Sequence, residues 1–470
     1  MKSRIGIYKI GFALLILMSC KKFIEVSPPS TQLVGASVYN SNTTAAAALT
    51  GIYQTMVSNS VGGGNFGISA LLGLSADEFL LYPNSDITFN QTYTNGILSN
   101  TDIPIWSNLY NCIYQANSAT EGLSSTNGVQ SEMNKQLTGE AKFIRAFCHF
   151  YLANIYGDVP LVTTTDYSVN QAASRAPKDQ VFNQIITDLK DAQSLLSDDF
   201  LAPDGTPTPD RVRPNKGAAT ALLARVYLYQ QKWDSAEAEA TAVINNTTYQ
   251  LQTDLNNVFL KNSAEAIWQL EPPNNGFNSP DGSFLLGLLY FGGPNSYSPL
   301  TLNDSLIGNF EPSDLRKTSW VISTVSGSTT YYYPYKYKLY YTGTAPTEYQ
   351  VVLRLAEQYL IRSEARAQQK NLSGAIADLN VIRNRAGLQD TSAPTQQELL
   401  KAIYHERRVE LFTEYGHRWL DLKRTANMDA VMNVVTPKKG GTWESTDQLY
   451  PIPLREIQSN ARLTQNPGYN

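Results

Sequence analysis

The sequence predicts a mainly α-helical fold in which tetratricopeptide-like helical hairpins form a scaffold and long loop and short-strand excursions carry a ligand face. Two stretches, 351–388 and 219–244, have the pattern of two amphipathic helices joined by a polar turn. Two others, about 59–100 and 271–350, are rich in Gly, Pro, Asn and Tyr and interrupt the helical pattern. Long insertions in a compact domain are usually functional, so we expect the ligand site there. We expect residues 41–470 to form one such domain.

The clearest hairpin is predicted over Val351–Leu388. Its first half repeats apolar residues such as Ala356 and Leu360 at three- and four-residue steps, so that one face can be buried. The polar stretch Gln369–Asn371 is short enough only for a tight turn between helices. Gly387 then supplies the left-handed residue that commonly ends a helix.

A second hairpin is predicted over Ala219–Ile244. Its turn carries the letters Gln-Gln-Lys at Gln230–Lys232, which also occur at Gln368–Lys370 in the first hairpin. The shared turn and the small residues at Ala236 and Ala240 favour a repeated helical hairpin. The alternative is that two unrelated amphipathic hairpins share a short pattern by coincidence.

The remaining elements follow from periodicity and from Gly and Pro stops. Helices are predicted over Thr43–Ser58, Trp106–Leu123, Met133–Tyr156, Lys178–Leu196 and Gln396–Tyr415, strands over Ala266–Leu270 and Thr330–Leu339, and mostly loop over 426–470. Helix pairs therefore alternate with the two excursions.

Residues 1–19 have the pattern of a signal peptide. A basic start precedes an apolar run that is too short to span a bilayer comfortably. Leu17–Cys20 resembles the lipobox of bacterial lipoproteins, in which Cys20 would be acylated and become the new N-terminus. Residues 20–40 would then be a lipidated spacer. The alternative is an ordinary secretory signal with a chance cysteine.

The charge balance argues against nucleic acid as a partner. The chain carries 41 acidic and 37 basic residues, and loss of Lys2, Arg4 and Lys9 with the signal peptide makes it more acidic. An acidic chain without basic clusters has no electrostatic reason to bind nucleic acid or anionic lipid. Tyrosine is unusually frequent, with 28 residues against 16 Phe, and suits surfaces that hold polar, ring-shaped ligands.

Cys112 and Cys148 are the only cysteines beyond Cys20. An exported protein could join them in a disulfide. Both also lie on predicted helices, where cysteines often pack as small buried apolar groups. The sequence leaves both possibilities open.

The sequence gives no support for catalysis, a cofactor or a metal site. The three histidines, His149, His405 and His417, have no metal-binding spacing. The sequence contains no nucleotide-binding glycine motif and no nucleophile elbow. Asp77 and Glu78 are adjacent carboxylates, but neighbouring residues in a helix or strand point apart and cannot face one sugar together.

Sugar binding needs aromatic faces flanked by hydrogen-bonding side chains, and both excursions supply them. The candidate ligand-binding residues are Asp77, Tyr82, Asn84, Tyr290 and Trp320, with Trp320 in a strand-like segment and Asp77 as a polar partner. The alternative for each aromatic residue is that it packs its loop onto the scaffold.

Five groups of residues, in chain order, resemble motifs of the SusD/RagB family of outer-membrane nutrient-binding lipoproteins. They are Cys20–Phe23 leading to Pro28; Gly139–Ala146 with Tyr156–Leu161; Arg354–Glu357 with Asn380–Gly387; Glu406–Leu411 with Gly416–Trp419 and Asp421–Leu422; and Pro451–Pro453 with Gln465–Tyr469. The charges within Glu406–Leu411 are spaced to tie neighbouring helices together, which gives these motifs a structural role.

The resemblance implies a lipid-anchored protein of the outer membrane that faces the cell exterior and has no enzymatic activity. It would capture an oligosaccharide and deliver it to a TonB-dependent transporter of the SusC type. Lys21 and Lys22 follow the lipobox where surface export would favour acidic residues, so the outward orientation depends on the resemblance alone. Three alternatives stay open: peptide capture, a tethered glycoside hydrolase, and a helical scaffold that binds another protein.

Overall fold

The computed structural model describes residues 38–59, 61–83, 85–274, 276–286, 293–296 and 298–469. Helices dominate these residues, and the few strands are short. The larger helices are α3 Asn42–Ser58, α6 Ile105–Ser124, α7 Ser131–Tyr156, α9 Lys178–Leu195, α10 Lys216–Tyr229, α11 Trp233–Ile244, α15 Leu355–Gln368, α16 Leu372–Arg385, α17 Gln396–Glu410 and α19 Met428–Lys438. The mainly α fold expected from the sequence is confirmed.

Shorter elements fill the connections between these helices. The short helices are α4 Ile68–Ser75, α5 Ile87–Tyr93, α8 Tyr167–Asn170, α12 Pro280–Leu286, α13 Asp304–Ile307, α14 Leu315–Trp320, α18 His417–Arg424 and α20 Leu454–Ser459, with 3-10 turns η2 Leu255–Asn257 and η4 Ser445–Gln448. The strands are β1 Phe79–Leu81, β2 Val159–Pro160, β3 Arg175–Ala176, β4 Ala266–Leu270, β5 Leu300–Leu302, β6 Val321–Ser326, β7 Thr329–Pro334 and β8 Gln350–Arg354. They form four antiparallel pairs: β1–β5, β2–β3, β4–β8 and β6–β7.

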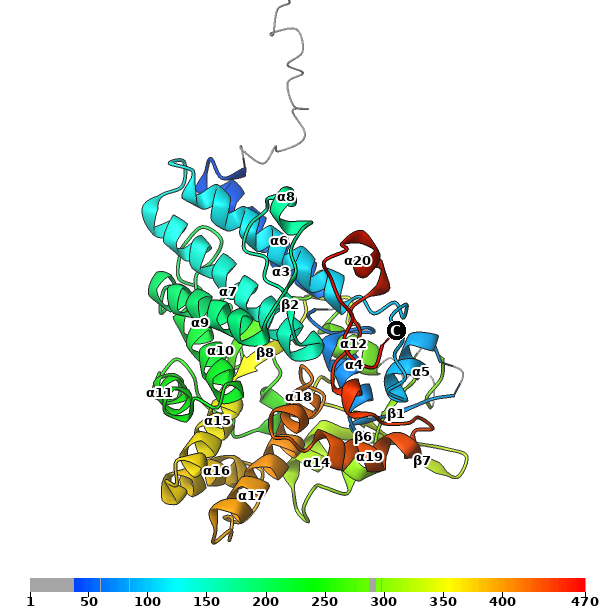
Figure 1. Ribbon diagram of the computed structural model, residues 1–470. Helices are drawn as coiled ribbons and strands as arrows, with labels where there is room; N and C mark the ends of the chain where they lie inside the picture. Colours follow the sequence, from blue (N-terminus) through cyan, green and yellow to red (C-terminus); the bar gives the residue numbers. More distant parts are fainter. Residues whose placement is uncertain are drawn as a thin grey trace, which may run out of the picture.

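The larger helices stack in chain order and form the scaffold. Helix α6 contacts α7, α7 contacts α9, α9 contacts α10, α11 contacts α15, and α15 contacts both α16 and α17. In Figure 1 this stack runs down the left side, and most of the short strands and small helices lie to its right. The molecule is therefore divided into a helical side and a side made largely of the two excursions.

The two predicted hairpins are neighbours, because α11 of the Ala219–Ile244 hairpin packs on α15 of the Val351–Leu388 hairpin. Their turns are alike: Gln231 and Lys370 each lie two residues beyond the preceding helix and have positive φ angles of 54° and 66°. In the structure Gln231 is thus equivalent to Lys370. The shared letters Gln-Gln-Lys would instead align Lys232 with Lys370, so the two alignments differ by one residue. Gly387 has a φ of 77° just past the end of α16, as predicted.

The start of the Val351–Leu388 prediction is wrong. Val351–Arg354 belong to β8, which pairs with β4 so that Trp268 faces Leu353, and the helix begins only at Leu355. A strand buried on both faces reads as a continuous apolar run, which periodicity alone does not separate from a buried helix. The strand predicted over Ala266–Leu270 is confirmed as β4.

Three other boundaries differ from the predictions. The stretch 426–470, expected to be mostly loop, contains α19 and α20, and the excursion 59–100 contains α4 and α5. The helix predicted over Gln396–Tyr415 ends at Glu410, where the chain turns toward the loops with positive φ at Thr413 and Tyr415. In α19 the buried residues Met428, Met432 and Thr436 recur at four-residue steps, so the local pattern there is itself helical.

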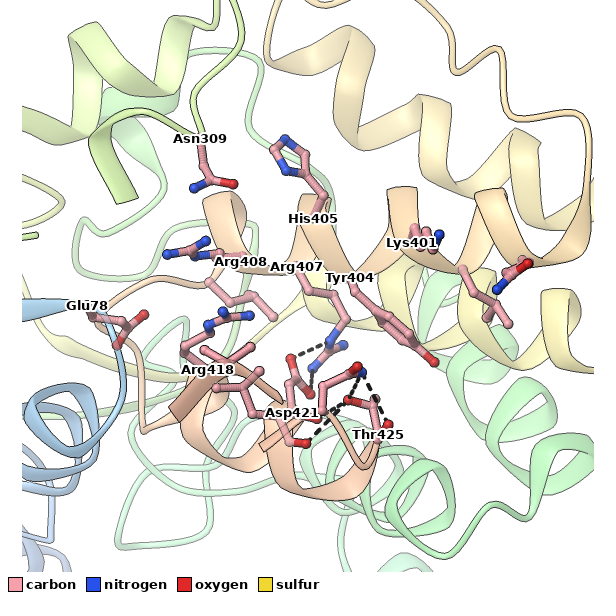
Figure 2. Close-up of a pocket in the computed structure, with 16 residues that line it drawn as sticks. Glu78, Asn309, Lys401, Tyr404, His405, Arg407, Arg408, Arg418, Asp421 and Thr425 are labelled. Carbon is pink, nitrogen blue, oxygen red and sulfur yellow. Dashed lines mark hydrogen bonds and ion pairs between the residues drawn. The ribbon is translucent and has the colours of Figure 1, made fainter. Parts of the chain in front are cut away.

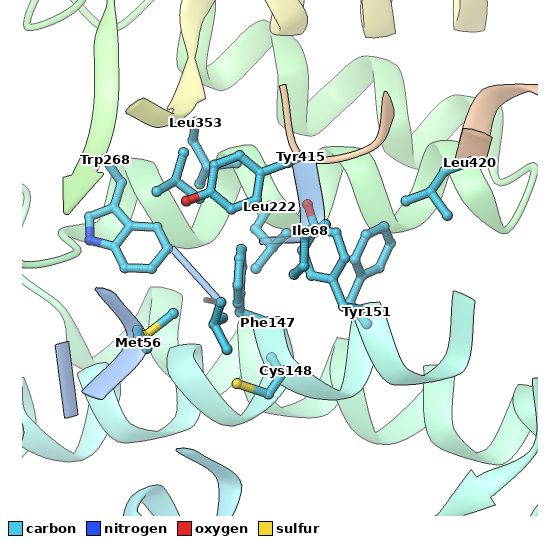
Figure 3. Packing of buried hydrophobic residues seen from close by; sticks show 14 of the residues in the cluster. Met56, Ile68, Phe147, Cys148, Tyr151, Leu222, Trp268, Leu353, Tyr415 and Leu420 are labelled. Atoms are coloured by element: carbon cyan, nitrogen blue, oxygen red, sulfur yellow. The ribbon is translucent and has the colours of Figure 1, made fainter. Parts of the chain in front are cut away.

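Aromatic side chains join the helical side to the loop side in the core (Figure 3). Phe147 of α7 lies edge-to-face against Trp268 of β4, with ring centroids 5.5 Å apart, and against Tyr415 at 6.2 Å. Cys112 and Cys148 are both free and buried in this core. Burial and the neighbouring Cys112 thiol raise the pKa of the Cys148 thiol well above its usual range.

A buried network of ion pairs holds α14, β8, α16 and α17 together. At its centre the Glu410 carboxylate, fully buried, accepts hydrogen bonds from Arg354 at 2.6 Å, from Arg316 at 3.0 Å and from Arg385. Burial by itself would raise the pKa of Glu410, but the three guanidinium groups outweigh it and hold that pKa well below the usual range. Glu406, one helical turn earlier, binds Arg316 at 2.5 Å. The structural role expected for this motif is confirmed.

Replacing Arg316 with methionine is expected to destabilise the protein by about 3 kcal/mol or more. The change leaves Asp314 buried without a guanidinium partner and leaves Glu406 with Arg383 alone at 3.3 Å, and an unpaired buried charge costs more than the pair contributes. Chemical denaturation gives the size of the effect. The matched control is Lys135→Met, which breaks an exposed pair with Glu132 on α7 and should shift the midpoint by less than about 1 kcal/mol. Equal effects in both variants would contradict the prediction.

Candidate functional site

The two excursions meet on one side of the molecule. Strand β1 of the first pairs with β5 of the second, with Phe79 opposite Leu302 and Leu81 opposite Leu300. Just beyond β1 the backbone N–H of Tyr82 donates to the carbonyl of Pro299 at 2.7 Å. These contacts bring together segments that are far apart in the sequence. We call the surface formed by the two excursions, about 59–100 and 271–350, the loop face.

Asp281 of α12 fastens the glycine-rich turn of the first excursion to the second. Its carboxylate accepts a hydrogen bond from the backbone N–H of Gly64 at 2.8 Å and another from the Gln350 side chain at 2.7 Å. Gly63 has a φ of 124°, and a side chain there would lie within 2.7 Å of the same carboxylate. Burial raises the pKa of Asp281 to about 6. This contact therefore requires glycine at position 63.

Two aromatic groups lie on this side. Phe89 of α5 is stacked between Phe66 and Phe284, with ring centroids 4.9 Å and 6.1 Å away. The second group surrounds Phe277, whose ring lies 4.9 Å from that of Tyr341. Tyr341 is 54% exposed, so its ring is accessible to a ligand.

Phe284, Tyr340 and Tyr341 are not among the ligand-binding candidates that the sequence indicated. Tyr340 is 36% exposed and lies 5.8 Å from Phe277. The available signal was the tyrosine-rich run that ends at Tyr341. That run contains buried, half-buried and exposed side chains without a regular alternation, and only the fold shows which tyrosines reach the surface.

Of the predicted ligand-binding residues that the structure describes, which are Asp77, Tyr82 and Trp320, Tyr82 alone lies on the surface. It lies at the end of β1 with 38% of its side chain exposed. Asn84 and Tyr290 lie outside the described residues, as does the predicted lipidation site Cys20. Tyr82 therefore stays a proposed ligand-binding residue.

Asp77 is held in a structural ion pair. Its carboxylate accepts hydrogen bonds from Arg418 at 2.7 and 2.9 Å and from Arg408 at 2.8 Å, and the residue is 3% exposed. Burial would raise the pKa of Asp77, but the two arginines outweigh it and lower that pKa to about 2. Asp77 thus ties β1 to α17 and α18 and does not face solvent. Its neighbour Glu78 points elsewhere and accepts from the Thr413 N–H at 3.1 Å, as expected for adjacent residues.

Trp320 also differs from the expectation of a surface aromatic in a strand. It is the last residue of α14 and is fully buried. Its indole N–H donates to the Leu255 carbonyl at 3.0 Å, and the Lys336 ammonium lies 5.0 Å from the ring centroid. The aromatic ring is part of the core, which was the alternative considered for each aromatic residue, and a ligand on the surface cannot reach it.

A cavity of about 440 Å³ lies between α17 and α18 (Figure 2). Its charged lining includes Glu78, Arg407, Arg408 and Arg418, and Lys401 lies at its exposed rim. Burial raises the pKa of the Glu78 carboxyl to about 7, so this group is only partly ionised near neutral pH. The cavity is within the size range of sites for small ligands.

Other site types have little support in the described part of the chain. There, no group of three or more His, Cys, Asp or Glu side chains is arranged to hold a metal ion. None of the helices described has both the length and the hydrophobicity needed to cross a membrane. The geometry instead presents an aromatic loop face and a charged cavity on a helical scaffold.

Comparison with known proteins identifies the family. A family model described as "Starch-binding associating with outer membrane" matches residues 22–228, and the model of the SusD family matches residues 315–469. The chain belongs to the SusD/RagB family. SusD-like protein P25 of Formosa agariphila is 24% identical over 98% of this chain and 97% of its own length.

Solved structures agree with this assignment. A SusD superfamily protein of Bacteroides vulgatus has a TM-score of 0.77 at 23% identity, with 92% of this chain and all of that chain covered. A laminarin-binding SusD-like protein has a TM-score of 0.73 at 25% identity, with 90% of this chain and 99% of that chain covered. This SusD-family chain therefore shares the fold of its relatives over nearly its whole length.

The variant Glu78→Gln tests the electrostatics of this SusD-family cavity. The folded protein retains the Glu78 proton up to a pKa of about 7 and the unfolded chain only up to 4.5, so raising the pH between these values favours unfolding. The wild type should therefore lose up to roughly 3 kcal/mol relative to Glu78→Gln across this window. Glutamine retains the acceptor for the Thr413 N–H.

Denaturant unfolding of both proteins from pH 4.5 to pH 8 measures this difference. Glu132→Gln, an exposed position on α7, is the control, and its offset from the wild type should not change across the window. A constant offset for Glu78→Gln as well would show that Glu78 is ionised throughout.

Proposed function

We propose that this protein is a lipid-anchored glycan-binding protein of the outer membrane. It captures an oligosaccharide on the loop face and delivers it to a SusC-like TonB-dependent transporter. The observation that carries the proposal is the meeting of two aromatic-rich excursions on one face of a SusD-family chain. Exposed rings such as Tyr82 and Tyr341 offer flat apolar surfaces that suit the C–H face of a sugar.

The relatives support a glycan as the ligand class. One matching family model carries the words starch-binding, and a structure with the same fold is that of a laminarin-binding protein. Starch and laminarin are both neutral glucose polymers, and their sugar units present apolar ring faces with hydroxyl edges. The loop face has exposed tyrosines whose rings and hydroxyl groups match that combination.

A glycoside hydrolase would need two accessible carboxyl groups on either side of the sugar bond. Among the described carboxyl groups of the two excursions, burial raises the pKa of Asp281 to about 6 and the pKa values of Glu348 and Glu78 to about 7. All three are buried and accept backbone hydrogen bonds, Asp281 from Gly64, Glu348 from Lys338 and Leu339, and Glu78 from Thr413. The cavity beside Asp281 is only about 10 Å³, too small for a sugar unit. These features favour binding without hydrolysis.

The first test is titration of the full chain, purified in detergent, against a panel of neutral and acidic polysaccharides, with chromatography of each mixture. We expect binding of at least one glycan with no new products, because the loop face has aromatic platforms without an accessible carboxylate pair. Released oligosaccharides would overturn the non-enzymatic proposal. Binding of peptides but of no glycan would identify a peptide-capturing member of the same uptake system.

Tyr82→Ala is expected to weaken glycan binding at least several-fold and leave the melting temperature nearly unchanged. The ring is partly exposed, so its removal deletes a stacking surface without opening a core cavity. Tyr114→Ala is the matched control, because Tyr114 is an exposed tyrosine on α6 of the scaffold. Unchanged affinity in Tyr82→Ala would remove Tyr82 from the site.

Cys20→Ala tests the lipid anchor. The variant should move from the membrane fraction to the soluble fraction after cell lysis, because an acyl chain on Cys20 would supply the membrane attachment. Metabolic labelling with a fatty acid should mark the wild type and not the variant. The control is Cys112→Ala, which leaves Cys20 intact and should retain both the label and the membrane association.

A further inference from the structure

A short antiparallel pairing supports the ring of Tyr341 on the loop face. Phe277 lies opposite Tyr341 in this pairing, and the Thr342 N–H donates to the Gly276 carbonyl at 2.8 Å. The Phe277 ring lies against the Tyr341 ring, with centroids 4.9 Å apart and ring planes at 56°. The position of the Tyr341 ring is therefore set both by its backbone and by a neighbouring ring.

Gly276 leaves the space that the Tyr341 ring occupies. A Cβ atom at position 276 would lie 2.7 Å from Cε2 of that ring, which is closer than a real Cβ contact. Gly276 also has a φ of 89°, in the left-handed region that favours glycine. A side chain at position 276 would therefore have to displace the ring.

The Tyr341 ring is also open to solvent. Tyr341 is 54% exposed, and every residue from 339 to 345 is exposed. A ring that is already held by its neighbours offers a flat apolar surface without the cost of ordering a mobile side chain. The exposed hydroxyl groups of Thr342 and Thr344, which are 3.1 Å apart, are close in the chain and can donate to or accept from sugar hydroxyl groups.

The two segments that build this platform have no charged side chains. Residues 272–280 and 339–347 consist of apolar, aromatic, hydroxyl and amide residues with glycine and proline. A ligand on the Tyr341 ring would therefore meet uncharged side chains from both segments. The charged residues that flank the segments must also be considered.

Lys338 and Glu348 flank the second segment and carry opposite charges. The Glu348 carboxyl is buried and accepts from the backbone N–H groups of Lys338 and Leu339. The Lys338 ammonium donates to the carbonyls of Ser319 and Tyr335 at 2.7 and 3.1 Å. Both charged groups are therefore engaged within the protein.

Glu271 and Asp281 flank the first segment. The Tyr349 hydroxyl donates to Glu271 at 2.8 Å, and the Lys261 ammonium lies 5.0 Å from the centroid of the Tyr349 ring, so Glu271 has an opposite charge nearby. Asp281 is buried in its contact with Gly64. The flanking charges are therefore either buried or offset by a neighbour of opposite sign, and the platform suits an uncharged ligand.

We propose that Tyr341 is a stacking platform for a neutral sugar unit of the captured glycan and that Gly276 positions its ring. This inference rests on the proposed function and adds to it a residue that contacts the sugar and the charge class of that sugar. A uronic acid on this platform would lose hydration of its carboxylate without gaining a cationic partner from either segment, so the site discriminates in favour of neutral glycans.

The test is calorimetric titration of the full chain in detergent with laminarin and soluble starch, and with alginate as the acidic counterpart. We expect a neutral glycan to bind and alginate to bind much more weakly. Tyr341→Ala should weaken neutral-glycan binding roughly tenfold because it deletes the ring, whereas Tyr341→Phe should retain most of the affinity. Both variants should keep nearly the wild-type melting temperature, because the side chain is exposed.

Gly276→Ala tests the positioning role. The added methyl group should displace the Tyr341 ring and weaken binding several-fold although the ring is still present. Gly327→Ala is the matched control: Gly327 also has a positive φ, 63°, but a Cβ atom added there would meet none of the described atoms within 4 Å. Both changes strain the backbone and should lower the melting temperature, and only Gly276→Ala should weaken glycan binding.

The outcomes separate this inference from the proposed function. Unchanged affinity in Tyr341→Ala, with a neutral glycan bound by the wild type, would overturn the inference and leave the proposed function standing. Alginate that binds as tightly as the neutral glycans would overturn the neutral class. Equal affinities of Gly276→Ala and Gly327→Ala would overturn the positioning role of Gly276. A wild type that binds neither these glycans nor any other polysaccharide of the panel would overturn the proposed function and this inference together.

Discussion

Glu410 lies where α14, β8, α16 and α17 meet, and three arginines converge on its buried carboxylate. Each arginine comes from a different element, so Glu410 of α17 helps to fix the positions of α14, β8 and α16. Burying these charges is costly, and the geometry offsets the cost only when all partners are present. The second excursion carries Arg316, which pairs with Glu410. The network therefore favours the one packing of this excursion on the scaffold in which Arg316 reaches Glu410.

Much of the scaffold could be predicted, because helices with one apolar face reveal themselves through local periodicity. Strand β8 could not, since the buried run Val351–Leu353 has no alternation to distinguish strand from helix. The site residues were harder still. Asp77 has the sequence context of a loop carboxylate, yet its partners Arg408 and Arg418 lie more than three hundred positions away. Trp320 was assigned to the surface because nothing local shows that the core closes over it.

Strand β1 joins two differently built parts of the molecule. Asp77, just before the strand, is bound to Arg408 and Arg418 in the wall of the α17–α18 cavity. Tyr82, just after the strand, is exposed beside the second excursion, to which β1 is joined by its pairing with β5. The ion pairs of Asp77 therefore anchor to the helices the strand that is followed by the exposed Tyr82 ring.

The pairing of β4 with β8 has an evolutionary consequence. The second excursion leaves the scaffold through one of these strands and returns through the other, so its two ends are held side by side by their own hydrogen bonds. The entropy of closing such a loop grows only slowly with its length. Segments of different length and composition could therefore be exchanged at this junction without disturbing the helices, much as antibody loops vary on a constant framework. Replacement of the second excursion alone would in this way give the same scaffold a new ligand specificity.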